Sequence, residues 1–525
     1  MKFYTPVLVI FATKLLSINS AIDDKLNALL ENLLKSDETF GRHFRFSDDD
    51  NRERHRFAVE IDATDWLTIR WAEYLKPLHR EKRITFIDPL YAAQLQSWST
   101  FPKMAIAETW AQGLSGKGVT VAVLDDGIDS THDDLRGSFD PAVSYDFISR
   151  RADVAPNVIE THGTRCAGII SMTANNSRCG VGIAYNSRIG GLVVLKKDQY
   201  LNDAIEGDAL AYKTNDIDIY SVSWGPADDG RTAELPGPLA QKALEYGVMH
   251  IVIGVATSSG LSPWYAEECS AIMASVSESS SGMVTTDVGN KCASISGSSA
   301  AASFAAAILA LALEANPSLT QRDVQHLIVH TSDSSQLMAA SPEHWVINGA
   351  GRSFSRRFGF GVLNPLRLTT AATQWKSVPV LTRCSRKLHI VNGTFTASAP
   401  LIVNLPFNGC SGTPGEVNWI ERLQLDVFLA HPRRGLISLL LSSPFGSTVE
   451  LLHTRRNDDS PDGLLEWPFV SVAQWSENPR GIWRIEARTA KHRNLEGVGL
   501  LKMVTLTIHG TREDPLKENT FVRLQ

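Results

Sequence analysis

The sequence lacks the features that mark nucleic-acid-binding and membrane-spanning proteins. Its 51 lysine and arginine residues are outnumbered by 57 aspartate and glutamate residues, which gives a formal net charge of -6 over 525 residues. Because nucleic-acid-binding proteins carry a basic excess, no nucleic acid is expected as a partner. After the N-terminal segment no stretch approaches the roughly 20 apolar residues that cross a bilayer, so no membrane span is expected in the processed protein.

Cysteine is scarce, and no two cysteines stand in a Cys-Xaa-Xaa-Cys pair, so a zinc site is not expected. An even number of cysteines in a secretory compartment favours disulfides. The six are Cys166, Cys179, Cys269, Cys292, Cys384 and Cys410. Two glycosylation sequons, at Asn175 and Asn392, fit the same compartment, although sequons also occur by chance.

The first 20 residues are typical of a signal peptide. Lys2 gives a positive start, a mostly apolar run extends from Tyr4 to Ile18, and the small residues Ser20 and Ala21 follow. This order favours removal of residues 1–20 and entry into the secretory pathway. The alternative is an N-terminus that is disordered or packs into the core.

The rest of the chain divides into regions that differ in composition and in hydrophobic pattern. Residues 21–83 are charged and end in Arg80-Glu81-Lys82-Arg83. Residues 118–316 alternate short apolar runs, such as Val119–Leu124, with alanine-rich helical segments, such as Ala300–Ala315. Alternating strands and helices predict an α/β domain with a parallel sheet, in which active groups gather at the carboxyl ends of the strands.

After about Trp375 strand-like runs dominate the sequence. They include Leu423–Leu429, Ile437–Leu441 and Met503–Ile508, and turn residues such as Ser460-Pro461-Asp462-Gly463 separate them. Many short strands with turn signals between them predict an all-β sandwich or barrel.

Three short segments carry residue types that suit nucleophilic catalysis. An apolar strand runs into Asp125-Asp126-Gly127, His162 begins a helix-compatible run, and Ser299 opens the long alanine-rich helix. Alone, each is more often a turn, a helix start or a helix cap. Together they stand in the order Asp, His, Ser that subtilisin uses. An imidazole can take the proton of a serine hydroxyl, a carboxylate can hold that imidazole, and a helix N-terminus can stabilise an oxyanion.

Longer motifs around these residues resemble the kexin/furin branch of the subtilases, the proprotein convertases. The motifs that carry the resemblance are Val123–Asp129, His162–Gly168, Cys179–Asn186 and Ser223–Gly230. The last of these is specific to convertases rather than to subtilases in general. The resemblance covers nearly the whole chain after the signal peptide.

The resemblance implies a domain organisation. Residues 21–83 would be a prosegment that is cut off after Arg83 and inhibits the enzyme. Residues 84–376 would be the subtilisin-like catalytic domain. Residues 377–513 would be the family's P domain, a β-sandwich that includes Arg434-Gly435, and residues 514–525 would be a tail.

The resemblance also implies roles for single residues. Asp125, His162 and Ser299 would form the catalytic triad. Selection of Arg or Lys requires carboxylates in a partly dry cleft. The acids at the family's substrate-binding positions are Asp126 for the second basic residue, Asp228 for the residue before the cut, and Glu206 and Glu234 for a more distant arginine. The alternative for each is a solvated surface charge.

The family uses structural calcium, which oxygen ligands hold. Asp88, Asp134 and Asn176 match one calcium site, Asp228 and Glu267 match two ligands of a second, and Asp146 with Asp153 remains from a divergent third. The disulfides that the family implies are Cys179 with Cys292 and Cys384 with Cys410, and Cys166 resembles its free thiol.

A stretch that the family contains is missing near Met249. Gly247–His250 runs almost directly into Ile251–Ala256, where the family has a core strand and an Ala-Ser-Gly-Asn-Gly-type loop. The asparagine of that loop donates a hydrogen bond to the oxyanion. The only asparagine between Asp228 and Ser299 is Asn290, which lies in another motif. The partner of Cys269 would lie in the same missing stretch.

Loss of one oxyanion donor costs about 10²–10³ in turnover, a figure measured on subtilisin itself. An isoform or gene model that skips an exon would explain the gap, and a true pseudoprotease is the alternative. The retained triad and subsite acids favour the first explanation.

The sequence therefore predicts a calcium-dependent serine endoprotease of the secretory pathway lumen or the extracellular space. Its substrates would be proproteins or neuropeptide precursors, cut after paired basic residues. The alternative is a secreted, catalytically impaired protein or isoform that binds basic peptides without turnover.

Overall fold

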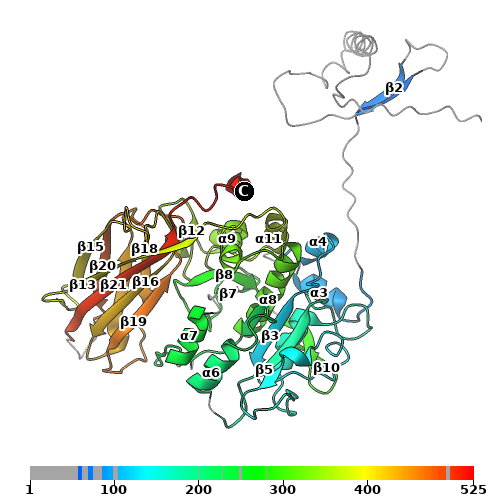
Figure 1. The fold of residues 1–525 in the computed structure, drawn as a ribbon, viewed down its shortest axis with the longest axis horizontal. Coiled ribbons are helices and arrows are strands. Elements are labelled where there is room, and N and C mark those ends of the chain that lie inside the picture. Colours follow the sequence, from blue (N-terminus) through cyan, green and yellow to red (C-terminus); the bar gives the residue numbers. More distant parts are fainter. Residues whose placement is uncertain are drawn as a thin grey trace, which may run out of the picture. The chain divides into compact units, whose positions relative to one another are not determined.

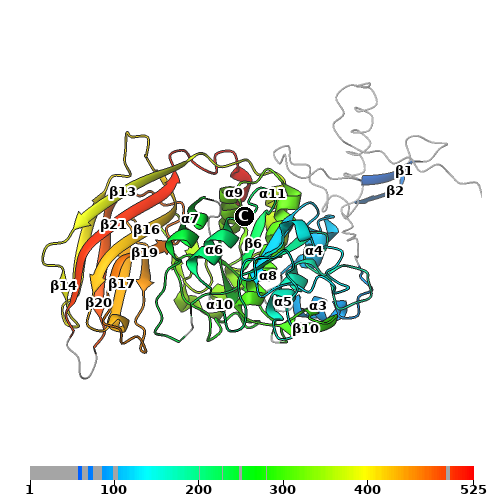
Figure 2. The same ribbon diagram turned by 60° about the horizontal axis from the view of Figure 1, so that its bottom comes forward.

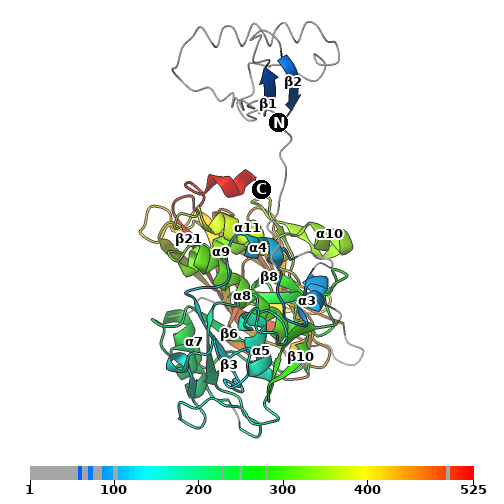
Figure 3. The ribbon, with the colours of Figure 1, turned by 90° about the vertical axis from the view of Figure 1, so that its right-hand side faces the viewer.

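The computed structural model describes residues 57–61, 69–74, 85–98, 104–199, 201–226, 229–246, 251–279, 281–491 and 497–524. The chain divides into two units, Met1–Lys82 and Arg83–Gln525. In the first unit, strands β1 (Phe57–Ile61) and β2 (Ile69–Tyr74) pair in antiparallel fashion (Figure 1 labels β2, and Figure 3 labels both strands). The expected signal peptide and the expected cut after Arg83 lie outside the described residues.

The second unit begins with the predicted α/β domain. Four parallel strands stand in the order β4 (Tyr145–Asp146), β5 (Arg188–Val193), β3 (Thr120–Asp125) and β6 (Ile219–Val222). All six residues of β3 are buried, because β3 lies between two other strands and helices cover the sheet. The apolar run that predicts a buried parallel strand is therefore confirmed.

The parallel sheet is interrupted after β6. Strands β7 (Val252–Ala256) and β8 (Ile272–Ser277) form a separate parallel pair. Within the described ranges neither β6 nor β7 has a second ladder partner. Val222 and Val252 on these two strands are 37% and 36% exposed. The break falls where the resemblance predicts that a core strand is missing; Met249 itself lies outside the described residues.

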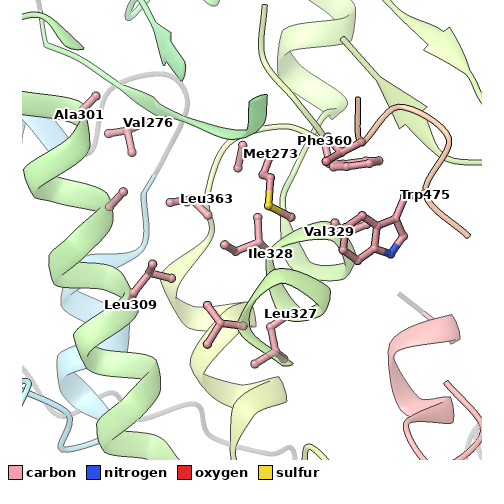
Figure 4. Packing of buried hydrophobic residues seen from close by; sticks show 14 of the residues in the cluster. Met273, Val276, Ala301, Leu309, Leu327, Ile328, Val329, Phe360, Leu363 and Trp475 are labelled. Carbon is pink, nitrogen blue, oxygen red and sulfur yellow. The ribbon is translucent and has the colours of Figure 1, made fainter. Parts of the chain in front are cut away.

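Helix α8 (Ser298–Ala315) is the central helix of this domain. Its small alanines let it pack closely against β6, β7 and helix α5 (His162–Ser171). Figure 3 shows α8 beside β6 and α5. The helix has the length and composition of a membrane span, but 67% of it is buried inside the fold. Figure 4 shows how the core continues from α8 through helix α9 (Gln321–Thr331) to Trp475 of the β-rich region.

The remaining elements of the α/β domain cover this core. They are α3 (Tyr91–Trp98), α4 (Ile106–Ala111), α6 (Asp203–Leu210), α7 (Pro238–Tyr246), α10 (Ser335–Ala340), α11 (Pro365–Ala372), β9 (Met283–Asp287), β10 (Lys291–Ile295), β11 (Val346–Ile347) and β12 (Ser353–Phe354).

The C-terminal region is built from two antiparallel sheets, as its turn-separated strands predict (Figure 2). One sheet has the order β13, β21, β16, β19, with β14 also on β21, and the other has the order β15, β20, β17, β18. The strands are β13 (Leu381–His389), β14 (Thr394–Phe395), β15 (Leu401–Phe407), β16 (Trp419–Ala430), β17 (Ile437–Ser442), β18 (Thr448–Leu452), β19 (Leu464–Ser471), β20 (Gly481–Thr489) and β21 (Gly499–Thr511). Burial alternates along β16, so one face of this strand packs into the core.

Two disulfides are present, Cys179–Cys292 and Cys384–Cys410. The first joins the segment after α5 to β10, and the second joins β13 to the loop after β15. Cys166 and Cys269 are free thiols. The pairing is the one that the resemblance implies.

Candidate active site

A buried carboxylate and an imidazole form the centre of the site. Asp125 is the last residue of β3 and is 1% exposed, and His162 is the first residue of α5. The distance from His162 Nδ1 to Asp125 Oδ2 is 2.7 Å. The hydrogen bond with Asp125 raises the pKa of His162 well above its usual range. This pair can fix the imidazole tautomer and stabilise an imidazolium.

Asp126 holds the beginning of the helix that carries His162. Its carboxylate accepts hydrogen bonds from the backbone N–H groups of His162 (3.0 Å) and Gly163 (2.7 Å). Thr161, at the N-cap position, makes no side-chain cap, so Asp126 supplies the cap from a distant part of the sequence. Burial and the neighbouring Asp125 raise the pKa of Asp126 to about 6. No pattern in the sequence indicated this capping role.

Gly163 explains why a glycine follows the histidine. A Cβ atom at this position would lie 2.4 Å from the carbonyl oxygen of Gly127 and 3.0 Å from Cβ of Asp125. The close approach of the α5 N-terminus to the end of β3 therefore requires a residue without a side chain.

Ser299 is the second residue of α8, where backbone N–H groups lack intrahelical partners. It is half-buried, and its Oγ donates to the carbonyl oxygen of Ser223, just after β6, at 3.5 Å. Although α8 packs against α5, no hydrogen bond joins the Ser299 hydroxyl to the imidazole among the described side chains. Glu278 accepts a hydrogen bond from the N–H of Gly297 at 2.8 Å and anchors the start of α8, a contact that the sequence did not indicate.

Asn290 is bound to Asp133 by two hydrogen bonds, and no contact among the described residues brings it to Ser299 or His162. Its amide nitrogen donates to Asp133 at 2.8 Å, and its oxygen accepts from the N–H of Asp133 at 3.0 Å. The donors that remain for an oxyanion are the backbone N–H groups at the start of α8.

The expected subsite acids lie on different elements. Glu206 is in α6. Burial raises the pKa of Glu206, although a hydrogen bond with Trp224 acts in the opposite direction. Glu234 is exposed. Asp228 lies outside the described residues, and no contact in the described part of the chain brings Glu206 and Glu234 together with Asp126.

The residues expected at the first calcium site are close together. Asp88 is buried and accepts from the N–H groups of Asn175 and Asn176 at 2.8 and 3.0 Å. The Asn176 side-chain amide bonds to Oδ1 of Asp134. The other oxygen, Oδ2 of Asp134, is buried without a hydrogen-bond partner. Two buried carboxylates with an unused oxygen fit a cation with oxygen ligands.

The other expected calcium residues differ from this group. Glu267 is exposed, and its expected partner Asp228 lies outside the described residues. At the divergent third site Lys196 Nζ lies 2.5 Å from Oδ2 of Asp146, and Arg151 pairs with both Asp146 and Asp153. The cationic side chains already neutralise Asp146, so this third group does not fit a calcium ion.

Two further expectations fall on described residues. Cys166 is buried with its Sγ 3.9 Å from Nδ1 of His162. Asn175 and Asn392 are both exposed, which a glycosylation acceptor requires.

An Asp–His pair at the end of a parallel strand and a serine at the start of the central helix define the subtilase class. The sequence profile of the Subtilase family matches residues 116–261 and 254–361, and that of the Proprotein convertase P-domain matches residues 420–508. The subtilase match falls into two segments that overlap at residues 254–261, which include the end of β7. The fold is also that of a serine protease from Aeromonas sobria, with a TM-score of 0.72 and 17% identity over 82% of this chain and 96% of that one.

The chain belongs to the proprotein convertases. It is 36% identical over 457 residues to neuroendocrine convertase 2 of Drosophila melanogaster. This alignment covers 78% of this chain and 69% of the relative. It is 35% identical over 513 residues to furin of Rattus norvegicus, which covers 89% of this chain. The chain spans 63% of the length of that furin.

Proposed function

We propose that this chain is a calcium-dependent serine endoprotease that cuts proproteins or peptide precursors after paired basic residues. The observation that carries the proposal is the 2.7 Å pair of His162 and Asp125, placed at a strand end beside α8, the helix that carries Ser299 as its second residue. The prosegment would be removed after Arg83 and would inhibit the enzyme. The disulfides and exposed sequons support action in the secretory pathway lumen or outside the cell.

The proposed reaction is acyl transfer. The hydroxyl of Ser299 attacks the carbonyl carbon of the scissile bond, and His162 takes the hydroxyl proton and later gives it to the leaving amine. Asp125 stabilises the imidazolium that forms in between. The Ser299 hydroxyl must turn from the Ser223 carbonyl toward the imidazole before attack. Backbone N–H groups of α8 stabilise the oxyanion.

Substrate selection would rest on the acids Asp126, Glu206, Asp228 and Glu234, because carboxylates in a partly dry cleft recognise Lys and Arg. Asp126 supports this role because it is partly buried beside the triad carboxylate. The same carboxylate would then serve both the helix start and the second basic residue of the substrate.

Calcium would be held by Asp88, Asp134 and Asn176, and at a second site by Asp228 and Glu267. At the first site the ion would neutralise two buried carboxylates and tie together the segments before α3, after β3 and after α5. Its contribution there is structural.

A fluorogenic Arg-Xaa-Lys-Arg peptide tests the proposal. In calcium the wild-type chain should release the fluorophore, and Ser299→Ala should lower turnover at least about 10³-fold because the nucleophile is lost. Ser298→Ala, at the exposed neighbouring serine, is the matched control and should retain turnover. A chelator should abolish turnover and added calcium should restore it. Undiminished turnover by Ser299→Ala would refute the mechanism.

A second candidate is a secreted protein that binds basic peptides without turnover. Two observations favour it: the Ser299 hydroxyl bonds to a carbonyl oxygen, and the Asn290 side-chain amide is hydrogen-bonded to Asp133. Tight binding of the same peptide without fluorophore release, unchanged in Ser299→Ala, would establish this alternative.

A further inference from the structure

The chain itself contains the kind of sequence that the proposed enzyme cuts. Exposed loop tips are the preferred sites of proteolysis, whereas paired strands and buried segments resist it. The fold therefore decides which pairs of adjacent basic residues are open to a protease. Six such pairs lie within the described residues: Arg150-Arg151, Lys196-Lys197, Arg356-Arg357, Arg386-Lys387, Arg433-Arg434 and Arg455-Arg456.

Five of the six pairs are protected. In four of them, a side chain that is no more than 22% exposed forms an ion pair: Lys196 with Asp146, Arg356 with Glu268, and Arg434 and Arg455 with Asp458. The pair Arg386-Lys387 lies within β13, whose backbone is hydrogen-bonded to β21. Cutting any of these five pairs would first require a buried ion pair or a strand ladder to open, which costs free energy.

Arg150-Arg151 is the exception. Residues 149–153 are all exposed and form a turn that follows β4. The contacts of Arg151 with Asp146 and Asp153 are both 3.7 Å long, and the Arg151 side chain stays 52% exposed. Long ion pairs of a half-exposed arginine contribute little to stability. Among the six pairs, this one is therefore the most open to a protease.

The turn is also easy to open. Two backbone hydrogen bonds between Asp146 and Arg151, at 2.8 and 3.2 Å, close it. Arg150 has a φ of 55°, a left-handed conformation that is strained for a residue with a side chain. Opening the turn relieves this strain, and Lys196 continues to neutralise Asp146 when Arg151 moves away.

The segment after the bond packs beside the active site. The carbonyl oxygen of Val154 accepts a hydrogen bond from the N–H of Ile128 at 3.1 Å. A Cβ atom at Gly127 would lie 2.7 Å from the same oxygen, so the segment lies directly on the residue that follows Asp126. Farther along, the segment leads into His162. A cut just before Val154 would leave this support attached at one end only.

We propose that the Arg151–Ala152 peptide bond is a second self-cleavage site, at which one copy of the enzyme cuts another and lowers its activity. This inference rests on the proposed function, which supplies the specificity for paired basic residues. Ser299 of the attacking copy takes up the acyl group of Arg151 and releases the amine of Ala152. Water then hydrolyses the acyl-enzyme, so that the nicked chain ends in a new carboxylate at Arg151.

The attacking cleft belongs to a second copy. Beyond the bond, Val154 is bonded to Ile128, and the Glu160 carboxylate, which is 7% exposed, accepts the N–H of Lys197 at 3.1 Å. A segment that is held to its own molecule in this way cannot at the same time extend along the cleft of that molecule. The cut should therefore be bimolecular.

Incubation of the wild-type enzyme with the full-length Ser299→Ala chain tests the site, because Ser299→Ala cannot cut itself. N-terminal sequencing should find a new terminus at Ala152, which forms faster at higher enzyme concentration. Adding Arg151→Gln to the Ser299→Ala chain should slow this cut at least about 100-fold, because a pocket built for a charged side chain rejects a neutral one. Arg136→Gln, at a 69% exposed arginine outside any basic pair, is the matched control and should leave the cut unchanged.

The fluorogenic peptide measures the effect on activity. Turnover by the wild type should decay as the Ala152 terminus accumulates, whereas Arg151→Gln in the active enzyme should keep its turnover. Absence of peptide turnover would refute the proposed function and remove the attacking enzyme. Turnover without any cut before Ala152, in either the wild type or Ser299→Ala, would refute this inference alone, and so would a nick that leaves turnover unchanged. A cut that the wild type makes in itself but not in Ser299→Ala would contradict attack by a second copy.

Limited trypsin digestion of the Ser299→Ala chain tests the accessibility of the turn without using the activity of this enzyme. Trypsin should cut after Arg150 or Arg151 at least about tenfold faster than after any of the other five pairs, because those pairs require local opening. A faster trypsin cut at one of the other five pairs would overturn the choice of site.

Discussion

At the scale of single residues, Asp126 joins two tasks. Its carboxylate caps α5 by accepting the N–H groups of His162 and Gly163, and it lies beside the buried carboxylate of Asp125. Burial and that neighbouring charge raise its pKa to about 6. An acid with a raised pKa loses its charge at a mildly acidic pH, where ordinary carboxylates remain ionised.

We therefore expect recognition of the second basic residue to weaken in mild acid. The ratio of kcat/KM for a Lys-Arg peptide to that for an Ala-Arg peptide should fall as the pH drops through about 6, because protonated Asp126 no longer attracts the lysine. The ratio cancels the titration of His162. Asp126→Asn should give a low ratio that does not change with pH. A wild-type ratio that stays constant between pH 7.5 and 5 would contradict the assignment.

At the scale of elements, the two strands that flank the break in the parallel sheet, β6 and β7, each have an unpaired edge within the described residues. Strand β3 pairs on both sides, whereas β6 pairs only with β3 and β7 only with β8 within the described ranges. Helix α8 packs against both β6 and β7. It cannot supply strand-to-strand hydrogen bonds for them, because its own backbone groups bond within the helix. Ser299 contacts the end of β6 and thus the weaker part of the sheet.

Amide hydrogen exchange measures this weakness. Amides of β6 and β7 should exchange at least about 100-fold faster than those of β3 and β5, because unpaired strand edges open locally at a lower free energy than interior strands. Strand β5 is the internal control, since it pairs with both β3 and β4. Equal protection of all four strands would show that the broken sheet is as stable as a continuous one.

At the scale of the whole molecule, a buried ionic group joins the α/β domain to the P domain. Glu421 on β16 accepts hydrogen bonds from Arg322 and His326 on α9, and all three side chains are largely buried. Although burial alone would raise the pKa of Glu421, these two partners lower it to about 2. Asp323 on the same helix binds the Trp375 indole and the N–H of Val378 at the domain boundary.

The Glu421 group should make stability depend on pH. Because its folded pKa is below the usual 4.5, its contribution is present above pH 4.5 and is lost as the pH falls toward about 2. Glu421→Gln should cost about 3 kcal/mol at pH 7 and remove this part of the acid dependence. The denaturant midpoint measured from pH 7 to pH 2 checks it, with the exposed Glu466→Gln as control. A Glu421→Gln midpoint equal to that of the wild type at pH 7 would refute the role.

The sequence predicted the class of fold and the central residues from local patterns. The apolar run before Asp125 predicts a buried strand, the alanine-rich run after Ser299 predicts a core helix, and the turn-separated strands after Trp375 predict the β-sandwich. Such patterns work because burial and backbone hydrogen bonding impose fixed periods on neighbouring residues. The missing stretch near Met249 could also be inferred from the sequence, and the sheet breaks at that place.

Only the tertiary structure decided what depends on contacts between distant segments. Asp126 caps α5 from 36 positions away, and Lys196 neutralises Asp146 from 50 positions away. Arg434 donates a hydrogen bond to the carbonyl oxygen of Arg231, about 200 positions away. No local pattern records such pairs, because the energy of a charged side chain depends on which groups the fold places within about 3–4 Å of it. The sequence by itself determined which chemical groups the protein contains. The packing of the folded chain decided which groups each of them contacts.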